Sequence, residues 1–260
     1  MKATVVYNRE VSPGLFRMSI ACDKKVQAGS PGQFVMVRGL WGADPLLSRP
    51  FSVYRYKPSN DADGVIQLLI KRAGKGTDLL TRLSPGDDLS VQGPLGNGFP
   101  DVTPVGRLFL VGGGIGIAPM MAVAESLPTE RLKKTLLVFG GKGAGDISGI
   151  DDDIGDVGVE TIYVTEDGSR GVRGTVMDIL EGDLSEDDVV FACGPRGMLR
   201  AISQLSGRIG SMAFVSHEER MACGVGLCLG CAAPTDTGSY ALTCKDGPVF
   251  EAQSIRWEEL

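Results

Sequence analysis

Four cysteines near the end of the chain have the spacing of an iron–sulfur ligand set. Cys223, Cys228, Cys231 and Cys244 follow the pattern C-x4-C-x2-C-x12-C. The first three match the run typical of plant-type [2Fe–2S] proteins, which also have a fourth cysteine downstream. A loop that presents three thiolates to one cluster must curl tightly, and glycine tolerates the positive φ values and close approach that this requires. The glycines of this loop are Gly224, Gly226 and Gly230.

Two other chemistries use cysteines in this way. Structural zinc usually takes two short-spaced pairs, whereas this chain has one C-x2-C step and a distant fourth cysteine. Disulfides need an oxidising compartment, and the start of the sequence, MKATVVYNRE, has no apolar signal region. The spacing therefore favours an iron–sulfur site over zinc or unligated thiols. Cys22 and Cys193 lie outside the set.

Two loops in the first hundred residues are suited to a phosphate-bearing cofactor. In Arg49-Pro50-Phe51-Ser52 a guanidinium can hold a phosphate through two parallel hydrogen bonds. The run KRAGKGT at 71–77 places glycines and a hydroxyl before a predicted helix at 78–83, where an anion is stabilised. Alone, these runs also fit a surface arginine and a basic hairpin tip. Together they favour a cofactor site.

A third loop, VGGGIGIAPM at 111–120, joins a predicted strand to a predicted helix. It is not the Rossmann pattern G-x-G-x-x-G, because Pro119 replaces the last glycine. Gly114 and Gly116 would still let a pyrophosphate approach the backbone at a helix start; the alternative is a glycine turn without a ligand. The run FACGPRGM at 191–198 ends a later strand, so Cys193 is expected at the same crevice unless it is an inert buried thiol.

Composition and charge narrow the class of protein. The 260 residues include 37 glycines and carry a net charge of −6, which disfavours binding to nucleic acids and anionic membranes. The longest uncharged apolar stretch, 108–124, contains glycines and a proline and is too short to span a membrane. We therefore expect a cytoplasmic protein. His217 is the single histidine; we expect it to be solvated, so histidine acid–base schemes are disfavoured.

The pattern of apolar residues changes near residue 104. Before it, short strands separated by Pro-Gly turns favour an antiparallel barrel, and after it strands alternate with helices, as in a parallel sheet. The strands are expected at 4–7, 15–20, 34–37, 51–54, 65–70, 108–111, 135–139, 161–165 and 189–192, and the later helices at 120–127, 176–180 and 198–205. The fold class is thus β plus α/β, with domains at 1–102, 103–215 and 216–260.

The motifs in this order, RPFS, GKGT, GGGIGIAPM and CGPRGM, resemble the ferredoxin–NADP reductase superfamily. The run ERMACGVGLCLGC with its fourth cysteine resembles one branch, the electron-transfer subunits of NAD-dependent dihydroorotate dehydrogenases. The resemblance covers nearly the whole chain. It implies an FAD-binding barrel, a nicotinamide-binding domain, a C-terminal [2Fe–2S] module, and a hetero-oligomer with a catalytic subunit that carries FMN.

The resemblance also implies roles for individual residues. Ser52, beside the flavin ring, and Cys193, beside the nicotinamide, would be the catalytic pair. The superfamily often has tyrosine where this chain has Phe51, so that hydroxyl is missing. The cofactor-binding residues would be Arg49, Pro50, Phe51, Ser52, Leu69, Ile70, Lys71, Gly76 and Thr77 for FAD and Gly114 and Gly116 for NAD, and the cluster ligands would be Cys223, Cys228, Cys231 and Cys244.

The function implied is electron exchange between NAD(H), FAD, the cluster and the FMN of the partner, where dihydroorotate becomes orotate in pyrimidine biosynthesis. Two alternatives stay open: a related reductase subunit serving a ferredoxin, sulfur reductase or hydrogenase, and a zinc-bearing interaction module without enzyme activity. Glu166 and Asp167, beyond the strand at 161–165, predict a preference for NAD over NADP, with Lys142 as the counter-argument. The uncharged loop with Leu227 and Leu229 is expected to face the partner.

Overall fold

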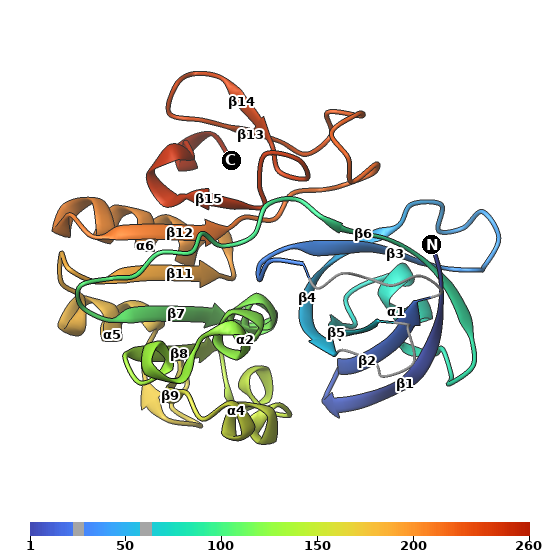
Figure 1. Cartoon of the computed structure of the whole chain (residues 1–260), viewed down its shortest axis with the longest axis horizontal. Helices are drawn as coiled ribbons and strands as arrows, with labels where there is room; N and C mark the ends of the chain where they lie inside the picture. Colours follow the sequence, from blue (N-terminus) through green and yellow to red (C-terminus); the bar gives the residue numbers. More distant parts are fainter. Residues whose placement is uncertain (23–28, 58–63) are drawn as a thin grey trace.

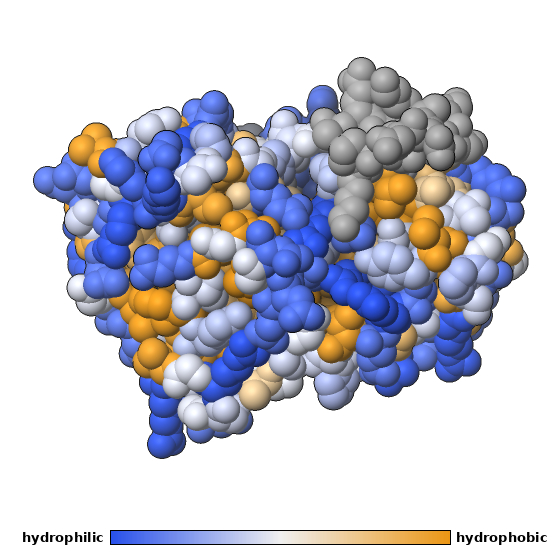
Figure 2. All heavy atoms as spheres, turned by 60° about the horizontal axis from the view of Figure 1, so that its bottom comes forward, coloured by the Kyte–Doolittle hydropathy of each residue, from blue (hydrophilic) through white to orange (hydrophobic). Residues whose placement is uncertain are grey.

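The computed structural model describes residues 1–22, 29–57 and 64–260. A barrel and an α/β unit lie side by side, and a small C-terminal module lies above both of them in Figure 1. In Figure 2, hydrophilic residues run along the middle of the face shown, with hydrophobic residues on either side. No helix in the described ranges is long and apolar enough to cross a membrane.

The first unit is a closed antiparallel barrel in the order β1-β2-β5-β4-β3-β6. Along β3, Val35 and Val37 enter the barrel core, whereas Phe34 and Met36 join a separate cluster outside it. The predicted barrel is confirmed, although its closing strand β6 was not predicted. The elements are β1 (Lys2–Ser12), β2 (Leu15–Cys22), β3 (Phe34–Gly39), β4 (Arg49–Lys57), β5 (Val65–Lys71), α1 (Lys75–Thr81) and β6 (Asp88–Leu95).

The second unit is a seven-stranded sheet in the order β10-β9-β8-β7-β11-β12-β15. All pairs are parallel except β12 with β15, so the predicted parallel sheet is confirmed. The strands are β7 (Leu108–Gly113), β8 (Thr135–Gly141), β9 (Glu160–Thr165), β10 (Val172–Arg173), β11 (Val189–Cys193), β12 (Met212–Ser216) and β15 (Val249–Glu251). The helices are α2 (Ile117–Ser126), α3 (Thr129–Leu132), α4 (Asp151–Val157), α5 (Val176–Asp183) and α6 (Arg196–Ile209), with 3-10 turns at Gly114–Gly116 and Ala144–Ile147.

The order of this sheet has a topological consequence. The chain proceeds from β7 outward through β8 and β9, then returns to place β11 on the other side of β7. Open α/β sheets bind ligands at such a switch point, outside the carboxyl ends of the strands. The glycine loop at 111–120 begins at the end of β7, and the CGPRGM run at 193–198 begins at the end of β11.

The C-terminal module is anchored on both units. Its strand β15 extends the α/β sheet, and Trp257 packs into the core of that sheet. On the other side, Cys231 and Cys244 pack with Phe34 and Met36 on the outer face of β3. The remaining elements are the hairpin β13 (Ala232–Pro234) and β14 (Tyr240–Leu242) and 3-10 turns at Ala252–Ser254 and Trp257–Glu259.

The expectation of a solvated histidine is wrong. His217 follows β12 and is 1% exposed, with its ring edge-on to Trp257 at a centroid distance of 5.7 Å. Its backbone N–H donates to the carbonyl oxygen of Pro248, 2.8 Å away. The histidine is buried because the C-terminal module folds back over β12, a contact between segments that are distant in sequence.

Candidate functional site

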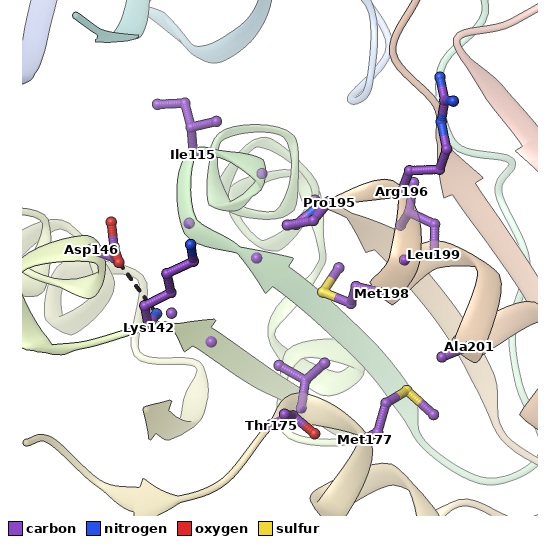
Figure 3. Close-up of a pocket in the computed structure, with 18 of the residues that line it drawn as sticks. Ile115, Lys142, Asp146, Thr175, Met177, Pro195, Arg196, Met198, Leu199 and Ala201 are labelled. Atoms are coloured by element: carbon purple, nitrogen blue, oxygen red, sulfur yellow. Dashed lines mark hydrogen bonds between the residues drawn. The ribbon is translucent and has the colours of Figure 1, made fainter. Parts of the chain in front are cut away.

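A cavity of about 800 Å³ opens at the switch point. It lies beyond the carboxyl ends of β7, β8 and β11, and Lys71 from the barrel also borders it. Figure 3 shows Thr175 and Met177 at one end and Ile115 at the other. The rest of the wall includes Gly113, Gly114, Gly116, Gly140, Gly141, Lys142, Asp146, Glu166, Gly194, Pro195, Arg196, Met198, Leu199, Ala201, His217 and Glu218.

The two glycines predicted to hold a pyrophosphate have different structural reasons. Gly114 has φ = +53°, and no described atom lies within 4 Å of the position a Cβ would take. Its backbone is therefore open to a ligand, at a φ value that disfavours other residues. At Gly116 a Cβ would lie 2.1 Å from the carbonyl oxygen of Cys193. Gly116 thus lets the loops after β7 and β11 pack against each other.

Cys193 lies behind the cavity wall. It is 1% exposed, and burial raises the pKa of its thiol well above the ordinary value. The thiol is therefore neutral at physiological pH, while the next two residues, Gly194 and Pro195, form the wall itself. This burial disfavours a reactive thiolate at this position. A small polarizable side chain supporting the wall agrees with the geometry.

A charged cluster that was not predicted from the sequence lies beside the cavity. Arg196 donates from Nη2 to Oε1 of Glu219 at 3.0 Å, and the same oxygen lies 3.1 Å from Nε2 of His217. Burial lowers the pKa of His217. Glu218 borders the open cavity, where the surrounding protein desolvates its carboxyl group and raises its pKa. The adjacent acidic residues were visible in sequence, but the fold of β12 brings them to the cavity.

The acidic residues beyond β9 separate in the structure. Glu166 borders the cavity, and so does Lys142, which carries the opposite charge. Asp167 instead accepts hydrogen bonds from the backbone N–H and hydroxyl of Ser169, at 2.8 and 2.6 Å. Asp146 accepts from the backbone N–H of Lys142 at 3.2 Å, the dashed line in Figure 3. Of the two predicted carboxylates, Glu166 is therefore the one placed to meet a ligand.

The two predicted flavin loops meet in space. A Cβ on Gly76 would lie 2.1 Å from Nε of Arg49, so the guanidinium lies directly against the glycine. Thr77 Oγ1 accepts from the backbone N–H groups of Ala73 and Gly74 at 2.9 and 3.0 Å, which holds the loop closed. Arg49 and Gly76, 27 positions apart in sequence, thus form one surface.

The other predicted flavin residues lie along the adjoining strands. Lys71 Nζ is 3.2 Å from Oδ1 of Asp146, so this part of the barrel adjoins the cavity of the α/β unit. Ser52 is half-buried on β4 and pairs across the strands with Phe34. The remaining residues differ in exposure: Leu69 and Ile70 are buried, Phe51 is half-buried and Pro50 is exposed.

The four cysteines of the C-terminal module lie together. Cys223 contacts Cys228, and Cys244 contacts Cys231, whose sulfur accepts from the backbone N–H of Cys244 at 3.4 Å; Cys244 also interacts with Cys223 across these two pairs. No three His, Cys, Asp or Glu residues within the described ranges enclose a single metal ion. Two ligands per iron is the arrangement of a [2Fe–2S] centre, whereas zinc needs four ligands around one ion. The pairing favours the cluster.

Backbone amides converge on these sulfurs. Gly226 N–H lies 3.1 Å from the sulfur of Cys244, and the N–H groups of Leu227 and Cys228 lie 3.3 and 3.4 Å from that of Cys223. Backbone amide hydrogen bonds lower the pKa of Cys223 to about 6; the largest contribution comes from Val225 and the next from Cys228. Burial raises the pKa of Cys244 to about 12. The loop thus supplies hydrogen bonds to two of the four sulfurs from its own backbone.

The backbone of the loop differs from the expectation at one glycine. Gly224 and Gly226 have φ = +71° and +79°, as the curl requires, whereas Gly230 does not have a positive φ. Leu229 takes that conformation instead, at φ = +58°, and among the described residues it is the only non-glycine that does so. A Cβ on Gly224 would lie 2.7 Å from Cγ of Met36. Close packing on β3 therefore adds a second reason for this glycine.

The fold and the motifs define the class of the protein. Residues 2–99 match the family model described as "Oxidoreductase FAD-binding domain", and residues 218–256 match "Iron-sulfur cluster binding domain of dihydroorotate dehydrogenase B". A barrel next to a doubly wound sheet with an iron–sulfur module is the architecture of an oxidoreductase that transfers electrons.

Curated relatives define the family. The chain is 38% identical to "Dihydroorotate dehydrogenase B (NAD(+)), electron transfer subunit" of Geobacillus thermodenitrificans over 98% of this chain and 97% of the relative. It is 37% identical to the protein of the same name in Clostridium acetobutylicum over 95% and 93%. The chain belongs to the family of dihydroorotate dehydrogenase B electron transfer subunits.

Solved structures share the fold. The structure entitled "Insights into flavin-based electron bifurcation via the NADH-dependent reduced ferredoxin-NADP oxidoreductase structure" has a TM-score of 0.83 at 25% identity and covers 99% of this chain and 90% of its own. The Amycolatopsis cytochrome P450 reductase GcoB has a TM-score of 0.66 at 23% identity, covering 81% and 67%. The second likeness shows the fold alone.

Proposed function

We propose that this chain is the electron transfer subunit that exchanges electrons between NAD(H) and the FMN-bearing catalytic subunit of a dihydroorotate dehydrogenase. FAD, when bound, joins the two-electron chemistry of nicotinamide to the one-electron chemistry of a cluster. The observation that carries the proposal is the meeting of three sites. The flavin loops adjoin the cavity through Lys71 and Asp146 and adjoin the cysteine module through β3.

The residues of the barrel fit FAD. Arg49 against Gly76 brings a guanidinium to the exposed residues 71–75, where the backbone of Gly74 has open space around it, which suits a pyrophosphate. Thr77 holds that loop in shape through its own hydrogen bonds. Ser52, on the strand that starts at Arg49, would approach the ring, and Lys71 would border it on the side of the cavity.

The cavity fits a dinucleotide, and we propose that NAD is preferred over NADP. Gly114 would accept the pyrophosphate, and Glu166 would accept hydrogen bonds from ribose hydroxyls while repelling a 2′-phosphate. The competing charge is Lys142. Steady-state kinetics with both cofactors test this: we expect at least a tenfold advantage of NADH in kcat/KM, reduced in Glu166→Gln. An NADP(H) advantage in the unmodified protein contradicts it.

The route from the barrel to the cysteines is short. Ser52 pairs with Phe34, and Phe34 packs in one cluster with Cys231 and Cys244. One residue of β3 thus separates the proposed ring site from two of the proposed cluster ligands. The apolar packing excludes water from this path, and the amide–sulfur hydrogen bonds stabilise the negative charge of the cluster.

The outward side of the cysteine loop would meet the catalytic subunit. Leu227 is 81% exposed and Leu229 63%, and the sequence carries no charge between Arg220 and Asp236. Exposed apolar side chains at a site that must pass electrons outward suit an interface core. We propose a hetero-oligomer on this basis.

We also propose that the chain has three domains, at 1–102, 103–215 and 216–260. We place it in the cytoplasm, because thiolate ligands and cysteines that form no disulfide in the described ranges suit a reducing compartment.

A related reductase subunit for a ferredoxin is the second candidate, favoured by the likeness of 25% identity to the NADH-dependent reduced ferredoxin–NADP oxidoreductase. The identity of 38% to the dihydroorotate dehydrogenase B subunits favours the first. Anaerobic purification with the catalytic subunit tests both. We expect about one FAD, one FMN and two irons per pair of subunits, a stable complex, and reduction of NAD by dihydroorotate only in that complex. Stoichiometric zinc, or no complex, contradicts the proposal.

A further inference from the structure

The barrel and the α/β unit are joined by a buried ion cluster in which Arg55 of β4 meets residues of α2 and α4. Asp153, on α4, is 5% exposed, and Arg55, on β4, is 6% exposed. Arg55 Nη1 lies 2.7 Å from Oδ1 of Asp153, and Arg55 Nε pairs with Glu125 at the end of α2. The second oxygen of Asp153 pairs with Arg17 on β2.

A β-bulge makes this cluster possible. The pairing of β4 with β5 shifts register between Val53 and Arg55. Val53 enters the barrel core, whereas Tyr54 joins the core of the α/β unit and donates its hydroxyl to Asp153 at 2.9 Å. Regular strand alternation would send Tyr54 and Arg55 to opposite faces. The bulge re-aims both toward the α/β unit, and bulges are frequent next to active sites.

The cluster connects the two elements that carry the cofactor loops. Strand β4 begins at Arg49, and Arg55 lies three residues beyond Ser52, roughly 10 Å along the strand. Helix α2 follows the glycine loop, and Glu125 lies nine residues beyond Gly116, roughly 13 Å along the helix. Hydrogen-bonded secondary structure connects each loop to its charged residue, through the strand pairs of β4 and the turns of α2. The ion cluster therefore sets how the two loops face each other.

The charges of the cluster balance. Two guanidinium groups, Arg17 and Arg55, face two carboxylates, Asp153 and Glu125. Removing the charge of Asp153 leaves a buried excess of positive charge, which costs free energy because the guanidinium groups cannot reach water without moving. The least costly relief is a change in how the two units pack. The neighbouring residue Asp152 is exposed.

We propose that Asp153 is a positioning residue for hydride transfer: through Arg55, Glu125 and Arg17 it holds the flavin strand β4 in register with the nicotinamide helix α2. The inference rests on the proposed function. It assigns a role in the reaction to a residue that touches neither cofactor loop.

The test uses Asp153→Asn in the FAD- and cluster-loaded protein, with Asp152→Asn as the matched control on the same helix. We expect the rate constant for flavin reduction by NADH to fall at least tenfold, because displacements of about 1 Å are sufficient for such losses. The isotope effect with 4-deuterated NADH should rise as the hydride step becomes limiting. Electron transfer from photoreduced flavin to the oxidised cluster should stay within about twofold, since the cysteines pack against β3 of the barrel. The control should match the unmodified protein.

Unchanged hydride transfer and an unchanged isotope effect in Asp153→Asn overturn the proposal. A parallel fall of all partial reactions with the folded fraction overturns it as well, because it reveals a purely structural role. If Asp153→Asn does not fold, Glu125→Gln at the more exposed end of the cluster is expected to give the same pattern at smaller size, and its absence there is decisive. Failure of the unmodified protein to be reduced by NADH would instead contradict the proposed function.

Discussion

The glycine loop after β7 and the cysteine loop of the C-terminal module both surround a proposed cofactor, but they are held in different ways. The glycine loop is packed between strands, with Gly112 against Ile117 and Gly116 against Cys193. The cysteine loop is largely exposed and is shaped by positive φ values and amide–sulfur hydrogen bonds. The first loop is built by the sheet, and the second depends on its own sulfurs.

This comparison predicts that loss of the cluster stays local. Cys228→Ser removes an exposed thiol that we propose as a ligand of one iron, and we expect complete loss of cluster absorbance and of the paired irons. FAD content and NADH–dye reductase activity should stay within about twofold, because the other two sites belong to the barrel and the sheet. Metal analysis and visible spectra measure this. Cys22→Ser, a buried thiol outside the module, should keep its irons; joint loss of FAD and cluster would show that the sites are not separable.

The packed loop should respond in the opposite manner. In Gly116→Ala the new methyl group would lie 2.1 Å from the carbonyl oxygen of Cys193, so two loops must separate. We expect flavin reduction by NADH to fall at least about thirtyfold while the cluster remains. Gly182→Ala on α5 is the control, because no described atom lies within 4 Å of its new methyl group and it does not line the cavity; it should match the unmodified protein. Stopped-flow reduction of both variants decides; an equal effect would refute the packing role of Gly116.

The exposed loop should also be where a single charge weakens the partner complex. Leu227→Glu is expected to weaken binding to the catalytic subunit about tenfold or more, because a charge at an apolar interface core must be desolvated. The cluster spectrum should not change. Val105→Glu is the control, since Val105 is also 81% exposed but lies in the connection between β6 and β7. Binding titrations measure both, and normal binding by Leu227→Glu would place the docking surface elsewhere.

His217 lies where the cavity meets the C-terminal module, and its burial predicts a smaller effect, that of pH on stability. Burial lowers the pKa of His217 below that of the unfolded chain, which is about 6.5. Below that pH the unfolded state binds more protons than the folded state. The contribution of His217 to the free energy of unfolding is therefore fully present above about pH 6.5. It is lost as the pH falls, by at most about 1.4 kcal/mol per pH unit. Denaturation of the unmodified protein and of His217→Gln measures the difference. The opposing titration of Glu218 is common to both, and identical pH profiles would contradict the assignment.

Some elements of the fold could be predicted from local sequence patterns, and others could not. Strands such as β3 and β8 and the loop at 111–120 follow from local apolar patterns and glycines. The strand β6 lacks a clear apolar run, since its sequence DLSVQGPL is mixed, and its pairing with β1 and β3 was not foreseen. Helix α4, with Asp153, reads as a polar acidic turn in sequence, so its buried partners were not predicted.

The sequence by itself determined the chemistry available to this protein: the spacing of the four cysteines, the glycine loop and the RPFS and GKGT runs depend on residues close together in the chain, where local geometry decides. Only the tertiary structure decided how these sites face each other. The contact of Arg49 with Gly76, the packing of Cys231 on Phe34, the burial of His217 and the cluster around Asp153 each join segments distant in sequence. Such contacts arise because folding buries apolar surface and pairs buried charge across elements, which no local pattern records.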